Sequence, residues 1–122
     1  MAEIMEQDQL ANVVVTTAAT PQDVYVLGTT GNTSATEVAI NSILLVNTST
    51  TTTVEVTAWS VPSGETRGNQ HIIVPSILIP PRGVEQAVPS KILAHTTAGA
   101  KITVEADTNA VITTVITGAE FI

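Results

Sequence analysis

The sequence predicts an all-β protein, a single-domain antiparallel β-sandwich of Ig-like or jelly-roll-like type with a short N-terminal arm. Short apolar segments separated by turn residues recur at roughly 8–12-residue spacing, which is typical of sandwiches and barrels. The chain has one Phe, one Tyr and one Trp, so Val, Ile, Leu and Ala must fill its core. Such a core suits the interior between two sheets packed about 10 Å apart. A length of 122 residues corresponds to one domain.

Short apolar clusters predict strands at 11–18 and 23–27, a nearly continuous apolar run predicts a strand at 37–46, and alternation of apolar and polar residues predicts a strand at 53–60. In the fourth of these, Val54, Val56 and Ala58 share one side and Trp59 lies on the other. The polar stretch NTSTTTTVEV, residues 47–56, follows the third strand and runs into the fourth. Because both flanks are strands, we expect its polar residues to form a hairpin loop between a central strand and a more exposed neighbour.

The second half of the chain predicts strands at 71–74, 76–79, 84–88, 100–106 and 110–117, with an ambiguous segment at 91–94. Pro75 separates the first two of these, because proline lacks the N–H group of a central strand and marks an edge strand or a bulge. We expect Ile102, Val104 and Ala106 to point into the core. The turn residues DTNA, 107–110, are expected to close a hairpin into the last strand.

The N-terminal segment MAEIMEQDQL is acidic. It has neither a basic region nor an apolar stretch of the kind found in signal peptides. We therefore divide the chain into an arm at 1–10 and a sandwich domain at 11–122. A helix at about 3–10 is the alternative to an extended arm.

Charge and composition exclude two classes of partner. Charged residues make up only 12% of the chain, and its formal net charge is −7. Nucleic-acid binding requires clustered basic residues, whereas the basic residues here are scattered singly: Arg67, Arg82, Lys91 and Lys101. No apolar run approaches the roughly twenty residues of a membrane helix. We expect neither a nucleic acid nor a membrane as partner, and the absence of cysteine excludes disulfides and thiolate metal sites.

The sequence contains no recognisable motif for catalysis or metal binding. A Ser–His–Asp set can be assembled on paper from Ser60, His71 and Asp107, but no G-x-S-x-G turn or other local signature accompanies it. Metal binding lacks a motif as well, because His71 and His95 stand 24 positions apart and zinc motifs use closely spaced pairs. We expect no catalytic residue, no cofactor and no metal site, and hence a protein that is not an enzyme.

The scarcity of charge favours a surface that contacts other proteins. Uncharged side chains are buried at lower desolvation cost than Lys or Glu, and the centres of interfaces are depleted in charge. The candidate contact residues are Trp59, Ile4, Met5 and Leu10. For Trp59 the alternative is that the strand ends there and the ring folds over the edge of the core.

Four segments of the sequence resemble small virion structural proteins of tailed bacteriophages. They are the strand end at Asn47–Ser49, the I-x-I-P-P corner at Ile77–Pro81, the G-x-x-I-x-V-x-A strand at Gly99–Ala106 and the ending at Val111–Glu120. The resemblance covers roughly residues 20–122. The chain departs from the pattern in the turn AHTTAGA, which lacks the usual Asp, and in the VLG that follows its VY pair.

The resemblance implies a non-enzymatic building block of the phage particle, assembled in the cytoplasm of the bacterial host. Its expected role is that of a capsid decoration or cement protein bound to the major capsid protein. A tail, neck or fibre-attachment component that contacts tail proteins is the alternative, and a carbohydrate-binding module is a further one. We expect a homo-oligomer, with a trimer favoured because local three-fold axes are natural docking points on an icosahedral shell.

Overall fold

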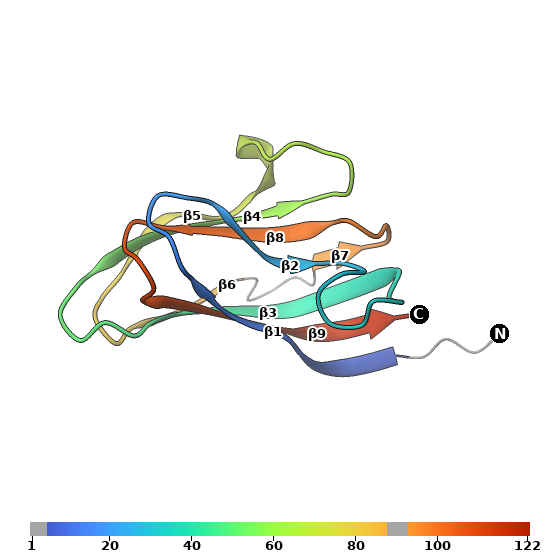
Figure 1. Cartoon of the computed structure of the whole chain (residues 1–122), viewed down its shortest axis with the longest axis horizontal. Coiled ribbons are helices and arrows are strands. Elements are labelled where there is room, and N and C mark those ends of the chain that lie inside the picture. The colour runs from blue at the N-terminus through green and yellow to red at the C-terminus, as the bar shows by residue number, and fades with distance from the viewer. Residues whose placement is uncertain (1–4, 88–92) are drawn as a thin grey trace.

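The computed structural model describes residues 5–87 and 93–122, and this part of the chain is all-β (Figure 1). Its strands are β1 (Met5–Val15), β2 (Gln22–Val26), β3 (Glu37–Asn47), β4 (Val54–Val61), β5 (Ile72–Ile79), β6 (Val84–Ala87), β7 (Leu93–His95), β8 (Lys101–Ala106) and β9 (Ile112–Phe121). One short 3₁₀ turn, Asn69–His71, precedes β5. The expected β-sandwich is confirmed.

The strands form two antiparallel sheets that pack face to face (Figure 1). Sheet A has the order β1-β9-β3-β6, and β7 also pairs with β3. Sheet B has the order β2-β8-β4-β5. Because β9 runs along one side of β3, the short strands β6 and β7 share its other side, opposite 43–46 and 38–40.

The order of pairing is that of a jelly roll. The antiparallel pairs nest inside one another along the chain: β1 with β9, β2 with β8, β3 with β6 and β7, and β4 with β5. A jelly roll forms when this series of strand pairs folds over into two sheets. Here the folding adds the pairings of β3 with β9 and of β4 with β8. Counting β6 and β7 as one interrupted strand gives the eight strands of this fold. Of the two sandwich types expected from the sequence, the strand order therefore selects the jelly roll.

Two loops expected to be hairpins instead connect the two sheets. The loop after β3 leads to β4, and the loop at 107–111 leads from β8 to β9, so each crosses from one sheet to the other. The prediction of hairpins was wrong because alternation reveals which face of a strand is buried but not which strand lies beside it.

Buried Asn47 explains the polar stretch after β3. Its Nδ2 donates hydrogen bonds to the carbonyl oxygens of Thr52 (2.8 Å) and Ile79 (3.0 Å), and its Oδ1 accepts one from the backbone N–H of Ser49 (3.0 Å). The side chain is 0% exposed. The amide thus satisfies the backbone carbonyls of Thr52 and Ile79 and the backbone N–H of Ser49 at this corner.

The N-terminal segment is not a separate arm over the residues described. Strand β1 begins at Met5 and pairs with β9 from Met5↔Phe121 onward, with a bulge between Gln9 and Ala11. The expected arm at 1–10 and the alternative helix are therefore wrong from residue 5. The partner strand lies more than one hundred residues away in sequence, so local composition could not reveal the pairing. Ile4 lies outside the described residues.

Pro75 lies within the continuous strand β5 and does not split it. This strand is at the edge of sheet B, and the register with β4 shifts between the pairs Val56↔Ile77 and Ala58↔Val74. An edge strand with an irregular register tolerates the missing N–H group of proline. The expectation of an edge or bulge is confirmed, whereas the separation into two strands is not.

Aliphatic side chains fill the space between the sheets. Val54, Val56 and Ala58 are all 0% exposed, which confirms the inward side expected for this strand. The inward side of β8 is confirmed in the same way, with Ile102 and Val104 at 0%. Each fully buried Val, Ile or Leu contributes roughly 1.5–3 kcal/mol relative to exposure. Both sheets are thus held by their inner faces, which leaves two outer faces for function.

Candidate interaction surface

The structure does not assemble Ser60, His71 and Asp107 into a triad. His71 accepts a hydrogen bond at Nδ1 from the backbone N–H of Gly68 (3.0 Å) and pairs through Nε2 with Glu65 (2.9 Å). The carboxylate of Asp107 accepts a hydrogen bond from the backbone N–H of Glu55 (3.1 Å). Each of the two residues thus has a local structural partner of its own.

Ser60 instead hydrogen-bonds to His95, with Oγ 2.7 Å from Nε2. Ser60 lies on β4 and His95 on β7, so the bond joins sheet B to sheet A. Burial lowers the pKa of the His95 imidazole below its ordinary value of 6.5, which keeps the ring neutral at pH 7. No sequence pattern indicates this pair, because the packing of the two sheets brings Ser60 and His95 together.

The Ser60–His95 pair borders a pocket of about 170 Å³ but lacks the parts of a nucleophilic site. The pocket is lined by Pro62, Ser63, His95, Thr96, Thr97 and Ala100. Ser60 is only 8% exposed and does not line it. Among the described residues, no carboxylate hydrogen-bonds to His95 to orient its ring. The pair is best understood as a bond that holds the two sheets together.

Residues 5–87 and 93–122 contain no group of three or more His, Asp or Glu side chains that could hold a metal ion. The same part of the chain has no helix of the length and apolarity that a membrane crossing requires.

A buried carboxylate, Glu120, is the polar centre that sequence analysis missed. It is 2% exposed, and it accepts hydrogen bonds from the Tyr25 hydroxyl (2.7 Å) and from the backbone N–H of Asn32 (3.2 Å). Burial, together with the hydrogen bond and charge of Glu120, raises the pKa of Tyr25 far above its ordinary value of 10.0. Glu120 has the same strand parity as inward-facing Ile112 and Ile116, and an acid at such a position was the available signal. Its contacts tie the β2–β3 loop and β2 to β9.

Trp59 lies on the outer face of sheet B. Strand β4 continues to Val61, so the strand does not end at the ring. The guanidinium of Arg67 lies 4.9 Å from the centre of the ring, within the range of a cation–π contact. Because Arg67 already occupies the ring, this contact does not favour Trp59 as an open platform for a sugar. The two other candidates that the structure describes also lie on strands: Leu10 is 7% exposed in the core of its own chain, and the backbone of Met5 pairs with Phe121.

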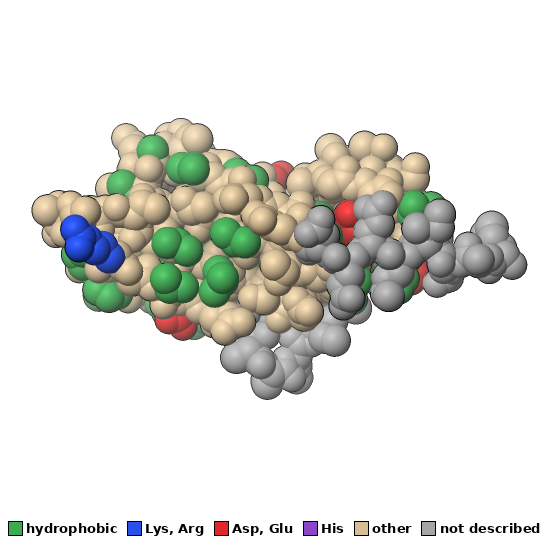
Figure 2. All heavy atoms as spheres, turned by 90° about the horizontal axis from the view of Figure 1, so that it is seen from below, with side chains coloured by type: hydrophobic (Ala, Val, Ile, Leu, Met, Phe, Trp, Pro, Cys, Tyr) green, Lys and Arg blue, Asp and Glu red, His purple; other side chains and the backbone are tan. Residues whose placement is uncertain are grey.

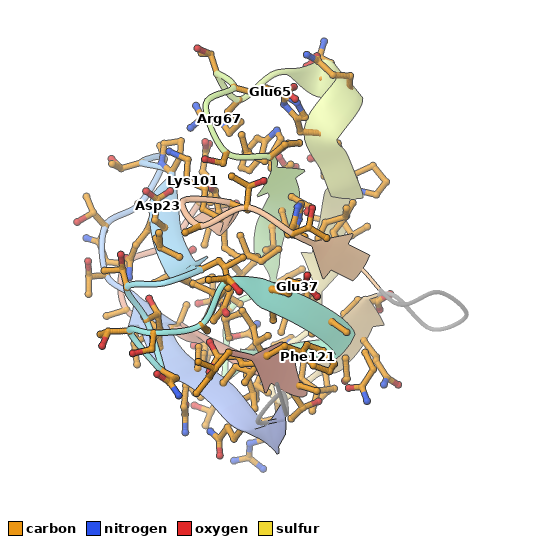
Figure 3. All side chains as sticks on the ribbon, turned by 90° about the vertical axis from the view of Figure 1, so that its right-hand side faces the viewer. Asp23, Glu37, Glu65, Arg67, Lys101 and Phe121 are labelled. Atoms are coloured by element: carbon orange, nitrogen blue, oxygen red, sulfur yellow. The ribbon has the colours of Figure 1, made fainter. Side chains whose placement is uncertain are left out.

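The outer face of sheet B is charged. It presents the acids Asp23, Glu55 and Glu105, together with Lys101 and the Arg67 side chain near Trp59. Figure 3 shows Asp23 and Lys101 beside one another, and their charged groups are 3.6 Å apart. A partner that covered this face would have to desolvate several charges.

The outer face of sheet A differs in carrying three consecutive rows of uncharged side chains. The cross-strand register gives the rows Asn12–Val115–Leu44–Gln86, Val14–Thr113–Val46–Val84 and Gln9–Thr117–Ser42. Figure 2 looks onto this sheet and shows a group of hydrophobic side chains in the middle of the face, with an acidic side chain at its lower edge and basic side chains at its left end. We call these three rows the neutral face.

The neutral face extends to both edge strands of sheet A. Its edge strands carry Val14, which is 42% exposed, and Val84, which is 57% exposed. Charged groups lie at its borders: exposed Glu85 stands between Val84 and Gln86 on edge strand β6, where it pairs with inward Leu45, and exposed Arg82 precedes that strand. Farther along the sheet, Glu37 on β3 lies beside Phe121 on β9 (Figure 3). The sequence predicted a surface poor in charge, but only the pairing of β1, β9, β3 and β6 gathers the uncharged residues on one side.

Neither the models of known protein families nor the curated proteins match this sequence. A function must therefore be drawn from the topology and from the contrast between the two outer faces.

Proposed function

We propose that this chain is a non-enzymatic structural protein of a bacteriophage virion and that it decorates the outer surface of the capsid as a cement protein. The observation that carries the proposal is the neutral face of sheet A. Depletion of charge with apolar side chains at the centre is the composition of a protein contact surface. The opposite face, with three acids and a covered Trp59, has the composition of a surface that stays in water.

The size of the neutral face suits a protein present in many copies. Four strands about 4.8 Å apart and three rows of residues give a flat area on the order of 400 Å². A standard stable interface buries about 800 Å² on each partner. One such contact is therefore weak, whereas contacts repeated over a symmetric shell add up through multivalency. Because such weak contacts are populated mainly when many copies are held on the assembled shell, they stabilise the lattice more than the free subunits.

The jelly-roll topology agrees with this role without deciding it. Jelly rolls occur in viral capsid domains and in lectins, and a fold alone does not fix a function. Between these two uses, the contact of Arg67 with the Trp59 ring disfavours sugar stacking, and the neutral face favours contact with protein. The proposed location is the virion, with the major capsid protein as partner and a homo-oligomer, favoured as a trimer, as the functional form.

The proposal is tested on particles of the phage that encodes this chain. Purified particles are separated into capsid and tail fractions, and mass spectrometry measures the copies of this chain per major capsid protein. We expect many copies in the capsid fraction, and shells that break at a lower temperature when the gene is deleted. Recovery with tails would replace the capsid role with the tail, neck or fibre-attachment role. Absence from purified particles would overturn the proposal as a whole.

A further inference from the structure

We propose that the neutral face of sheet A packs against the same face of a second copy of this chain, which forms a pair related by a two-fold axis. This inference rests on the proposed role as a building block present in many copies. It goes beyond that role by naming the occupant of the face.

The distribution of charge makes a second copy the fitting occupant. The chain has a net charge of −7, so two copies repel one another in most orientations. A contact through sheet B would set Asp23, Glu55 and Glu105 against the same acids of the other copy, and like charges in a contact are costly. The three rows of the neutral face contain no ionisable side chain, and exposed Glu85 on β6 lies at the edge of the sheet, paired with inward Leu45. Copies can therefore approach one another through this face with the least repulsion.

The neutral face is also complementary to itself. Leu44 and Val115 are cross-strand neighbours near its middle, and Val46 lies in the next row. A two-fold axis through this region would place the apolar centre of one copy on that of the other, as an isologous contact requires. Around the centre, amide and hydroxyl side chains such as Asn12 and Gln86 can hydrogen-bond across the rim or to water.

The pairing contact is distinct from the contact that would build a trimer. A face that meets its own copy produces a two-fold pair, whereas a three-fold ring joins two different surfaces. The pair can therefore join neighbouring rings on a lattice or stand alone. Since the neutral face is smaller than a standard interface, the free pair should form only at high protein concentration.

Sedimentation velocity on the intact chain tests the pairing, with concentration varied from about 10 µM to about 1 mM to cover weak association. The test variant is Val84→Lys, which places a charge on an exposed position of the neutral face. The matched control is Leu78→Lys, at an exposed apolar position, 67% exposed, on β5 of sheet B. Both variants change the net charge from −7 to −6 (−7 + 1) and thereby reduce overall repulsion.

We expect the wild type and Leu78→Lys to shift from monomer towards dimer as concentration rises. Val84→Lys should associate at least tenfold more weakly, even though its net charge is lower. Added salt should leave the wild-type pair intact or strengthen it, because no ion pair joins the copies and repulsion is screened. Equal association of the two variants, or a wild type that stays monomeric at the highest concentration, would overturn the pairing.

Cross-linking gives a second measurement that does not depend on Val84. The chain has no cysteine, so a short bismaleimide reports only on an introduced thiol. Thr113→Cys lies in the neutral face and should give a linked dimer, whereas Thr57→Cys, on the outer face of sheet B, should not. Absence of the Thr113→Cys dimer at concentrations where the wild type associates would overturn this geometry. If the chain is present in capsids but does not pair, the pairing is overturned and the proposed function stands. If the chain pairs but is absent from phage particles, the proposed function is overturned and the pairing stands.

Discussion

The Tyr25 hydroxyl donates a 2.7 Å hydrogen bond to Oε2 of Glu120 inside the protein. Tyr25 belongs to β2 of sheet B and Glu120 to β9 of sheet A, so this bond fastens one sheet to the other. A buried carboxylate is tolerated because donors from the Tyr25 side chain and the Asn32 backbone satisfy it.

Removal of this hydroxyl should destabilise the fold. Tyr25→Phe leaves Oε2 of Glu120 without its donor, and an unsatisfied buried acceptor costs about 1–3 kcal/mol in the free energy of unfolding. Urea denaturation at neutral pH measures the difference. Glu105→Gln, at an outward position of β8, is the control and should change the free energy by less than about 0.5 kcal/mol. Equal stability of Tyr25→Phe and the control would show that the bond is dispensable.

The raised pKa of Tyr25 predicts a loss of stability in alkali. Above pH 10.0, the ordinary value for tyrosine, the unfolded chain loses the Tyr25 proton while the folded chain retains it. The contribution of the Tyr25 hydroxyl to the free energy of unfolding is thus fully present below that pH and declines as the pH rises. Because Tyr25 is the only tyrosine in the chain, its ultraviolet absorbance reports this one ionisation. The titration should be delayed until unfolding and become normal in urea, and a normal midpoint in the folded protein would contradict the burial of the hydroxyl.

The lowered pKa of His95 predicts a loss of stability in mild acid. Below pH 6.5 the unfolded chain binds a proton at His95 before the folded chain does, so unfolding becomes more favourable as the pH falls. His95→Gln removes this titration but leaves a group that can hydrogen-bond to Ser60. Its free energy of unfolding should depend less on pH than that of the wild type in this range. Identical pH profiles of the two proteins would refute the linkage.

Gly31 and Gly64 form a matched pair for the β2–β3 loop. Both have positive φ, +71° and +80°, so alanine at either position incurs about 1–2 kcal/mol of backbone strain. A Cβ at Gly31 would also lie 2.9 Å from Oε1 of Glu120, whereas nothing lies within 4 Å of one at Gly64. Gly31→Ala should therefore lower the melting temperature more than Gly64→Ala. The reverse order would argue against close packing of the loop on Glu120.

Strand positions and their buried sides could be predicted because alternation is local. Val54, Val56 and Ala58 were expected inward and are fully buried, and the same holds for Ile102 and Val104. The strand at 5–10 was missed because its residues form a strand only through pairing with β9. The last strand was placed at 110–117 and in fact extends to Phe121, where inward Glu120 is satisfied by Tyr25 from the opposite sheet.

The sequence does not reveal which strands pair with one another, and the neutral face exists only because β1, β9, β3 and β6 are neighbours. Leu44 and Val115 are far apart in sequence and become neighbours only when β3 pairs with β9. Composition predicted that the surface would be poor in charge, but it could not show that three rows of sheet A would be uncharged while acids gather on the outer face of sheet B. The hydrogen bond between Ser60 and His95 could not be predicted either, because it depends on how the two sheets pack against each other.

The central claim is that the neutral face serves assembly of the particle. The most direct test compares how many copies of Val84→Lys and of Leu78→Lys are present in purified phage particles. Both variants add one lysine at an exposed apolar position, one on sheet A and the other on sheet B. Copies per major capsid protein in purified particles are counted for each variant and for the wild type. The neutral face predicts that Leu78→Lys occupies the particle as the wild type does, while Val84→Lys is strongly depleted. Wild-type occupancy by Val84→Lys, folded as judged by circular dichroism, would contradict the role assigned to this face.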